Sequence, residues 1–554
     1  MNEPALKIYD TTLRDGSQAL DINFTVEEKI RLIKELDEFG MNYIEAGWPR
    51  AGSLDDEVYR RASKMKLRHA KIAAFGATKK HGIKVAEDPL IKALIESKAQ
   101  VATIFGKTWI AHVTYQLKTT PEENLQLIFQ TISYLKNNKI HTFDEVIYDA
   151  EHFFDGYKSD PDYALKTVKY ALMGGADIIV PCDTNGGSLP WEVGEIIQDL
   201  KKYIDKDNDI IRTLQGRKPG IGIHCHNDSE LAVANTLEAV RKGVTHVQGT
   251  INGIGERIGN ANLCSILANL GLKTKYKLPK AIKLEKLAEI SNTVQRISGQ
   301  RPKLDAPFVG AKAFAHDGGV HVDAVLKGAS YHHIDPEKVG NKMRIVLSTN
   351  SGKASIYGVV KSLGFDVEKD DPRLLEMLKE VHQRCADGYD LSILDDEHYL
   401  LALKYFGNIK HKIQINRCDV TSHFSDVDGK IEHDNSCILK MDVDGIEYKV
   451  FEDTENGPVG VNFKAIKQAL KKAKLPTNFE LVNYEVGLPK VRAGAGSKIQ
   501  TYITYEDSEG RRITTSGFHE DIIASSRESL VKASLLIAER SKTQNNKNKR
   551  KISK

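Results

Sequence analysis

The most informative stretch of this chain is Gly220-Ile221-Gly222-Ile223-His224-Cys225-His226-Asn227-Asp228. Its first half is apolar and typical of a buried strand, in which residues two apart point to the same face. His224 and His226 should therefore project together, and Cys225 should face the opposite way. Two imidazoles on one strand face can hold a metal ion, but a hydrogen-bonded pair of core histidines would leave the same pattern.

The surrounding sequence alternates short β-branched runs with amphipathic helical runs. The runs typical of strands are 7–13, 43–47, 71–76, 101–106, 145–151, 177–183, 220–227 and 246–252. The clearest helical patterns between them are 26–39, 121–137, 163–173, 192–203 and 230–242. Eight strand–helix units over about 270 residues predict an α/β fold, a (β/α)8 TIM barrel. A doubly wound open sheet is the competing architecture, but it usually has fewer strands.

A barrel of this kind makes a positional prediction, because its functional residues lie at or just beyond the carboxyl ends of the strands. The sequence places polar residues at these positions. They are Arg14 and Asp15 after the first strand, Glu45 in the second, Glu151 ending the fifth, Thr184 after the sixth, His224 and His226 in the seventh, and Asn260 in the segment after the eighth. We therefore expect these side chains to converge at one end of the barrel.

The chain predicts further domains behind the barrel, because 554 residues exceed what one core usually organises. We assign residues 1–275 to a catalytic barrel, 276–345 to a linker and subdomain, 346–410 to a helical subdomain, 411–540 to an α+β regulatory domain and 541–554 to a basic disordered tail. Residues 437–474 and 499–540 form a weak internal repeat of a hairpin followed by a helix. Such an appendage more often regulates or dimerises than catalyses.

Composition narrows the class of protein. Hydrophobic residues make up 41% of the chain, but no apolar run reaches about 18 residues, so we expect no membrane span. The start of the chain lacks the features of a signal peptide, and six scattered cysteines without a Cys-x-x-Cys suit a reducing, cytoplasmic setting. The net charge of +4 arises in the basic tail. A nucleic-acid-binding arm is an alternative interpretation of that tail, but we expect no nucleic-acid partner.

The predicted barrel end would combine one carboxylate, two neutral imidazoles and an amide oxygen. These come from Asp15, His224, His226 and Asn260. A mixed oxygen and nitrogen set of this kind suits Mn²⁺, Mg²⁺ or a catalytic Zn²⁺ with open positions. A metal there could act as a Lewis acid on the carbonyl of a 2-keto acid.

Three further residues could act on such a keto acid. Arg14 could stabilise its carbonyl oxygen as an alkoxide, Thr184 could bind its carboxylate, and Glu151 could transfer a proton. Structural alternatives stay open: Arg14 and Asp15 could form only an ion pair, and Asn260 could only cap the next helix. For Glu256–Arg257 we favour a salt bridge that supports the eighth loop.

Several motifs resemble those of a known family. Residues 10–18 (Asp-Thr-Thr-Leu-Arg-Asp-Gly-Ser-Gln), 224–228 and 252–262 are similar to three signatures of the metal-dependent barrels that condense or cleave acyl-CoA substrates. This family includes 2-isopropylmalate, homocitrate and citramalate synthases and hydroxymethylglutaryl-CoA lyase. Residues 313–323 resemble the mobile subdomain motif of the synthases, and 410–540 are similar to their leucine- or isoleucine-binding regulatory domain, which the lyases lack.

Within this family, residues 45–49 and 105–113 look most like the citramalate synthases of the long type. That resemblance implies a Claisen condensation of acetyl-CoA with pyruvate to (R)-citramalate and CoA, in isoleucine biosynthesis. It also implies a homodimer inhibited by isoleucine. A 2-isopropylmalate synthase acting on 2-ketoisovalerate is the alternative within the family. A lyase and a non-enzymatic amino-acid sensor are alternatives from other classes.

The resemblance also implies roles for individual residues. Asp15, His224, His226 and Asn260 would hold the metal, with Mn²⁺ as the first candidate. Arg14 would polarise the keto oxygen, Thr184 would bind the substrate carboxylate, and Glu151 would assist deprotonation of the acetyl methyl group. His321, together with Asp323 and Tyr331, would serve acetyl-CoA and thioester hydrolysis, reaching the barrel of the neighbouring subunit.

Overall fold

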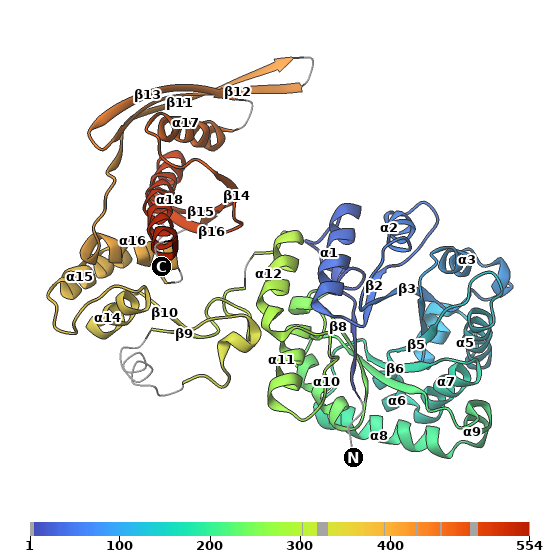
Figure 1. The fold of residues 1–554 in the computed structure, drawn as a ribbon. Helices are drawn as coiled ribbons and strands as arrows, with labels where there is room; N and C mark the ends of the chain where they lie inside the picture. The colour runs from blue at the N-terminus through green and yellow to red at the C-terminus, as the bar shows by residue number, and fades with distance from the viewer. Residues whose placement is uncertain are drawn as a thin grey trace. The chain divides into compact units, whose positions relative to one another are not determined.

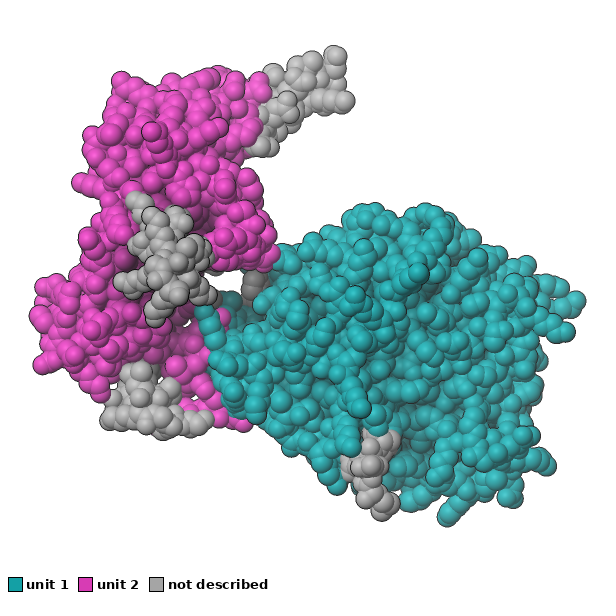
Figure 2. Space-filling view, viewed as in Figure 1, with its two compact units in different colours: residues 1–314, 334–342 teal, residues 315–333, 343–554 magenta. Residues whose placement is uncertain are grey.

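The structure is a computed structural model that describes residues 5–301, 303–317, 331–392, 394–427, 430–454, 457–487 and 497–552. The chain forms two compact units (Figure 2). Unit 1 contains residues 1–314 and 334–342, and unit 2 contains residues 315–333 and 343–554. Each unit has hydrophobic clusters of its own.

Unit 1 contains a closed barrel of eight parallel strands that neighbour one another in chain order (Figure 1). The strands are β1 (Lys7–Asp10), β2 (Tyr43–Gly47), β3 (Lys71–Ala77), β4 (Val101–Lys107), β5 (Glu145–Glu151), β6 (Ile178–Asp183), β7 (Gly220–Cys225) and β8 (His246–Gly249). The barrel closes where β1 pairs with β8, with Lys7 opposite His246. The predicted (β/α)8 fold is therefore confirmed.

Helices follow the strands and surround the barrel (Figure 1). They are α1 (Val26–Phe39), α2 (Leu54–Ala62), α3 (Pro89–Glu96), α4 (Ile110–His112), α5 (Pro121–Lys136), α6 (Phe153–Ser159), α7 (Pro161–Met173), α8 (Pro190–Lys206), α9 (Asn208–Leu214), α10 (Ala232–Arg241), α11 (Leu263–Lys273) and α12 (Leu287–Ile297).

Helix α1 shows how local sequence sets these boundaries. Thr25 and Glu28 form a reciprocal capping box at its start, which satisfies backbone N–H groups that have no intrahelical partner. Gly40 ends the helix at φ 105°, a left-handed conformation that favours glycine. A side chain at Gly40 would also collide with the carbonyl oxygen of Ala281, which lies 2.1 Å from the Cβ position.

Three strands end earlier than the sequence predicts. β1 ends at Asp10 rather than at residue 13, because the backbone N–H groups of Asp15 and Gly16 turn back to the carbonyl oxygen of Thr11. β7 ends at Cys225, and β8 ends at Gly249. The polar residues therefore lie partly in the turns that follow the strands.

Unit 2 begins with a short parallel pair, β9 (Ala315–His316) and β10 (Arg344–Ile345). Three helices follow: α14 (Lys353–Ser362), α15 (Arg373–Ala386) and α16 (Asp395–Phe406). The phenolic oxygen of Tyr389 lies 2.7 Å from Oγ of Ser516, and this contact joins the helical segment to the sheet region of the same unit.

The carboxyl-terminal half of unit 2 contains two three-stranded antiparallel sheets, each followed by a helix. The first set is β11 (Ile413–Val427), β12 (Lys430–Val443), β13 (Ile446–Thr454) and α17 (Pro458–Lys472). The second is β14 (Phe479–Gly487), β15 (Ile499–Asp507), β16 (Arg512–His519) and α18 (Ile522–Ile552). The internal repeat predicted a hairpin in each half, and the structure adds a third strand to each, β11 and β14.

Helix α18 continues to Ile552, so residues 541–552 are helical. This differs from the disordered tail that composition predicts for residues 541–554. The segment contains no glycine or proline and several lysines, a residue type that favours helix, so a preceding helix can extend into it. In the part of the chain that the structure describes, no helix has the length and apolar character needed to span a membrane.

Candidate metal centre

Three potential metal ligands converge at the carboxyl end of the barrel. Asp15 lies in the turn after β1, His224 lies in β7, and His226 follows the end of β7. One oxygen of Asp15 and one ring nitrogen of each histidine lie within 4.8 Å of one another. Nε2 of His224 is 3.3 Å from Nε2 of His226 and 3.4 Å from Oδ2 of Asp15. The two rings therefore face the same point as the carboxylate, which a pair of core histidines alone would not require.

Asn260 lies beside this cluster, because its backbone pairs with that of His226 in an isolated antiparallel bridge. Its Nδ2 donates to the carbonyl oxygen of Ile254, but among the described residues no donor satisfies its buried Oδ1. An unsatisfied buried acceptor costs about 1–3 kcal/mol, and a bound cation would satisfy it. The capping alternative fails, since Asn262 caps α11 instead. Gly255 is needed for this packing, because a Cβ there would lie 2.2 Å from Nδ2 of Asn260.

The electrostatics of the cluster favour one anion and a neutral imidazole. Burial opposes ionisation of Asp15, but Arg14 and the two histidines outweigh it and hold its pKa well below the usual range. Burial lowers the pKa of His226 to about 4, with partial opposition from Asp15. For His224, burial lowers the pKa, but the hydrogen bond and charge of Asp15 outweigh that cost and leave the pKa raised.

Arg14 is fixed by more than its ion pair with Asp15. Its Nη1 is 3.2 Å from Oδ2 of Asp15, and its Nε donates to Oε2 of Glu45 at 2.6 Å. Glu45 is fully buried and also accepts hydrogen bonds from the hydroxyl groups of Tyr9 and Thr11. The guanidinium carbon of Arg14 lies 3.6 Å from the centre of the Phe75 ring. Glu45 therefore orients an arginine whose side chain stays 10% exposed.

Glu151 and Thr184 lie at the same end of the barrel. Glu151 ends β5 and forms an ion pair with Lys107, its register partner at the end of β4. Oγ1 of Thr184 accepts the backbone N–H of His152 at 2.9 Å, which leaves its own hydroxyl hydrogen available to a substrate. The sequence interpretation gave no role to Lys107, although its position at a strand end was an available signal.

Arg257 links three loops of this barrel end. Its guanidinium donates to both carboxylate oxygens of Asp228, at 2.7 and 2.9 Å, and to the carbonyl oxygen of Thr184 at 2.7 Å. Glu256 lies farther away, at 3.5 Å. The structural role favoured for this arginine agrees with these contacts, but Asp228 is its main partner.

The predicted acetyl-CoA residues belong to another part of the chain. His321 and Asp323 lie outside the described residues. Tyr331 lies in unit 2, is 48% exposed, and has its ring 6.3 Å from that of His316.

A buried pair of side chains lies behind His224, and the sequence interpretation missed it. Oε1 of Gln248 in β8 is 3.0 Å from Nδ1 of His224, and Nε2 of Gln248 donates to Oδ1 of Asp149 in β5 at 3.0 Å. Burial raises the pKa of Asp149 to about 7, although His224 opposes the shift. Same-face spacing was the available signal, because Asp149 lies two residues before Glu151 on its strand.

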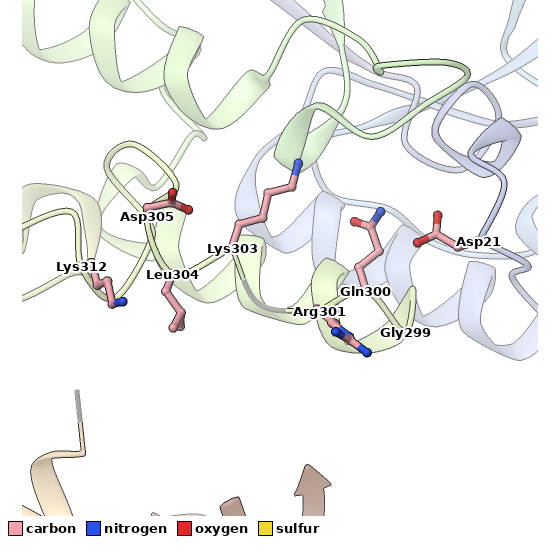
Figure 3. Close-up of a pocket in the computed structure, with 8 residues that line it drawn as sticks. All are labelled: Asp21, Gly299, Gln300, Arg301, Lys303, Leu304, Asp305 and Lys312. Atoms are coloured by element: carbon pink, nitrogen blue, oxygen red, sulfur yellow. The ribbon is translucent and has the colours of Figure 1, made fainter. Parts of the chain in front are cut away.

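A cavity of about 730 Å³ lies elsewhere on unit 1 (Figure 3). It is lined by Asp21, Gly299, Gln300, Arg301, Lys303, Leu304, Asp305 and Lys312. None of the converging ligands lines it, so it is not the metal centre. Its charged lining consists of three cationic side chains, Arg301, Lys303 and Lys312, and two carboxylates, Asp21 and Asp305.

The barrel and its cluster define a class: (β/α)8 proteins with a carboxylate–imidazole site at the carboxyl end of the strands. Comparison with known families places the chain within that class. Residues 5–294 match the HMGL-like family, 308–387 match the homocitrate synthase post-HMGL domain-like family, and 392–537 match the LeuA allosteric (dimerisation) domain. The chain belongs to the HMGL-like family.

Curated relatives sharpen the comparison. The chain is 41% identical to an (R)-citramalate synthase of Aquifex aeolicus, over 95% of this chain and 97% of the relative. It is also 41% identical to an (R)-citramalate synthase of Geobacter sulfurreducens, over 95% and 96%. A 2-isopropylmalate synthase of Pyrococcus furiosus is 31% identical, over 95% and 98%. These relatives confirm the predicted similarity to citramalate synthases. The family match confirms the prediction that the protein is an enzyme.

Proposed function

We propose that this protein condenses acetyl-CoA with pyruvate and that water then cleaves the thioester, which gives (R)-citramalate and CoA. The convergence of Asp15, His224 and His226 beside Arg14 is the observation that carries the proposal. The similarity to two (R)-citramalate synthases along nearly the whole chain supports the choice of substrates.

The donor set suits a divalent cation, and Mn²⁺ is our first candidate ahead of Mg²⁺ and Zn²⁺. Asp15, His224, His226 and Asn260 would hold this cation. A cation bound there supplies Lewis-acid polarisation of the keto group. Arg14, oriented by Glu45, donates to the keto oxygen and stabilises the negative charge that develops on it.

Thr184 and Glu151 act in the condensation step, and three further residues act on acetyl-CoA and its thioester. The hydroxyl of Thr184 donates to the carboxylate of pyruvate, since its oxygen already accepts a backbone N–H. Glu151, held by Lys107, takes a proton from the acetyl methyl group, and the resulting carbanion equivalent attacks the keto carbon. His321, Asp323 and Tyr331 serve acetyl-CoA and the hydrolysis of the thioester.

An aromatic wall supports pyruvate over larger keto acids. The rings of Phe75 and Phe105 stack at 5.2 Å, and the ring of Trp48 packs edge-on against both at 5.5 Å. This wall borders the guanidinium of Arg14 through Phe75. Close-packed aromatic rings beside the proposed keto-oxygen donor leave more room for a methyl than for an isopropyl substituent.

The direct test supplies the purified protein with Mn²⁺, acetyl-CoA and a panel of 2-keto acids, and measures the release of free thiol. We expect the highest kcat/KM with pyruvate. A preference for 2-ketoisovalerate would favour the 2-isopropylmalate synthase alternative, and thiol release with no keto acid would contradict both.

The second unit would regulate this activity. We propose that it forms a homodimer and binds isoleucine, supported by the match of residues 392–537 to the LeuA allosteric (dimerisation) domain. Isoleucine is the expected effector because citramalate leads to that amino acid. Titration of isoleucine and leucine against initial rate tests this, and a flat response to both would assign the unit a structural role only.

The cavity on unit 1 would receive the phosphates of CoA. Arg301, Lys303 and Lys312 supply three cationic side chains to its lining, against two carboxylates, so the charged side chains leave a net positive charge. Phosphate oxygens accept hydrogen bonds from such groups. Neutralising these residues should therefore affect acetyl-CoA and not pyruvate.

A further inference from the structure

His224 is held from behind by two buried side chains, Gln248 and Asp149. Exposed fractions are 5% for His224, 0% for Gln248 and 3% for Asp149. Because solvent does not reach Gln248, its amide must find its hydrogen-bond partners inside the barrel. The two contacts of 3.0 Å described above supply them, one at each end of the amide.

Asp149 determines which way the amide of Gln248 faces. When Asp149 is ionised, its oxygens only accept hydrogen bonds, so the amino group of Gln248 faces Asp149 and the carbonyl oxygen faces His224. Nε2 of His246 lies 3.5 Å from the same amino group, and it accepts from that group in the tautomer with the proton on Nδ1. The carbonyl oxygen of Gln248 then requires a donor from His224.

Only a protonated Nδ1 of His224 can supply that donor. The neutral imidazole carries one proton, so a proton on Nδ1 leaves the lone pair on Nε2. That atom is the one that lies 3.3 Å from His226 and 3.4 Å from Asp15. The other ring differs, because among the described residues no partner satisfies the buried Nδ1 of His226.

We infer that Gln248 and Asp149 are positioning residues that set the tautomer of His224, so that Nε2 is ready to bind the divalent cation. The inference rests on the metal site in the proposed function. Metal-binding histidines commonly donate their second N–H to a carboxylate or carbonyl group. Here an amide separates the imidazole from the carboxylate. The ring is oriented without a second negative charge in contact with it.

Two variants separate this role from ordinary core packing. Asp149→Asn keeps the shape, but its amide can donate, so Gln248 can reverse and donate to Nδ1, which moves the imidazole proton to Nε2. Gln248→Met keeps the length of the side chain and removes the strong acceptor. Thr131→Val is the matched control, because it removes a buried hydrogen bond within α5, outside the chain of contacts.

The first measurement is the dissociation constant of Mn²⁺ for each full-length variant, by competition with a chelator. We expect Asp149→Asn and Gln248→Met to weaken binding about 10–100-fold, and Thr131→Val to leave it unchanged. Thermal unfolding of the same samples checks that the variants remain folded. Variants that stay folded and bind Mn²⁺ as tightly as the parent would overturn the inference.

The second measurement is the ¹⁵N NMR spectrum of the His224 ring in the metal-free parent, assigned with His224→Ala. The spectrum is recorded at a pH at which the ring is neutral, since the raised pKa of His224 places protons on both nitrogens at lower pH. A neutral ring with its proton on Nδ1 is expected, and a neutral ring with its proton on Nε2 would refute the inference even if a variant failed to fold. His224→Ala also distinguishes the proposed metal site from the proposed positioning role of Gln248 and Asp149. If it binds Mn²⁺ like the parent, the metal site itself fails; if it loses Mn²⁺ while the positioning variants do not, only the positioning role fails.

Discussion

His224 and His246 are both buried inside the same barrel, but their surroundings are opposite. They lie on adjacent strands one layer apart, since His246 pairs in register with Gly222, two residues before His224. The ring of His246 lies 5.4 Å from the rings of Tyr9 and Tyr43, and burial lowers its pKa to about 3. The pKa of His224 is instead raised, because Asp15 outweighs burial.

The difference shows that the barrel interior has two layers with separate tasks. The lower layer is a packed cluster that Tyr9 and Tyr43 share with aliphatic residues of four other strands, and it keeps His246 neutral. The upper layer holds charges that compensate one another, with Arg14 between Glu45 and Asp15. A buried charge is tolerated only where partners repay its desolvation.

The largest expected effect comes from the upper layer. Asp15→Asn removes the proposed anionic ligand, so turnover should fall by about three powers of ten or more, which corresponds to about 4 kcal/mol of transition-state stabilisation. Rate measurements at saturating substrates and metal analysis of the variant check this. A variant that binds as much metal as the parent and turns over as fast would contradict the assignment of Asp15 as a metal ligand.

Arg14→Lys should have the next largest effect. A lysine ammonium cannot reproduce the planar fork that contacts Glu45 and Asp15 while stacking on Phe75. We expect kcat to fall about 10²–10³-fold with smaller changes in Mn²⁺ affinity. An equal loss of metal affinity and turnover would mean that this arginine only supports the ligands.

The lower layer predicts an effect of pH on stability. The pKa of His246 is about 6.5 in the unfolded state and about 3 in the folded state. Between these values only the unfolded state binds a proton at His246, so the free energy of unfolding decreases as the pH falls from 6.5 to 3. His246→Phe should remove this contribution to the pH dependence. The difference between the free energies of unfolding of parent and variant should therefore change by about 1.4 kcal/mol per pH unit. Denaturant unfolding at pH 7, 6, 5 and 4 measures it. Parallel curves would show that folding does not lower the pKa of His246.

The smallest effect concerns a surface outside both layers. Lys303→Gln with Lys312→Gln should raise the KM for acetyl-CoA about 3–10-fold and leave the KM for pyruvate unchanged, because exposed charges contribute little each. Lys280→Gln with Lys283→Gln, on the same unit outside the cavity, is the control. If both double variants raise the KM for acetyl-CoA equally, the increase comes from the change in net charge and not from the cavity.

The alternation of strands and helices was enough to predict the barrel. The two-residue period of a strand also predicted that His224 and His226 share a face, and the motif around Arg14 and Asp15 indicated the family. These features are local, because each depends on the spacing of neighbouring residues along the chain.

Only the tertiary structure revealed the side chains behind the site. Gln248 reaches His224 from β8 and Asp149 reaches Gln248 from β5, while Glu45 anchors Arg14 from β2. These contacts depend on the register with which the eight strands pair around the closed barrel. The pattern of residues along a single strand does not determine that register. Local spacing thus specified which residues face inward, and barrel closure decided which of them touch.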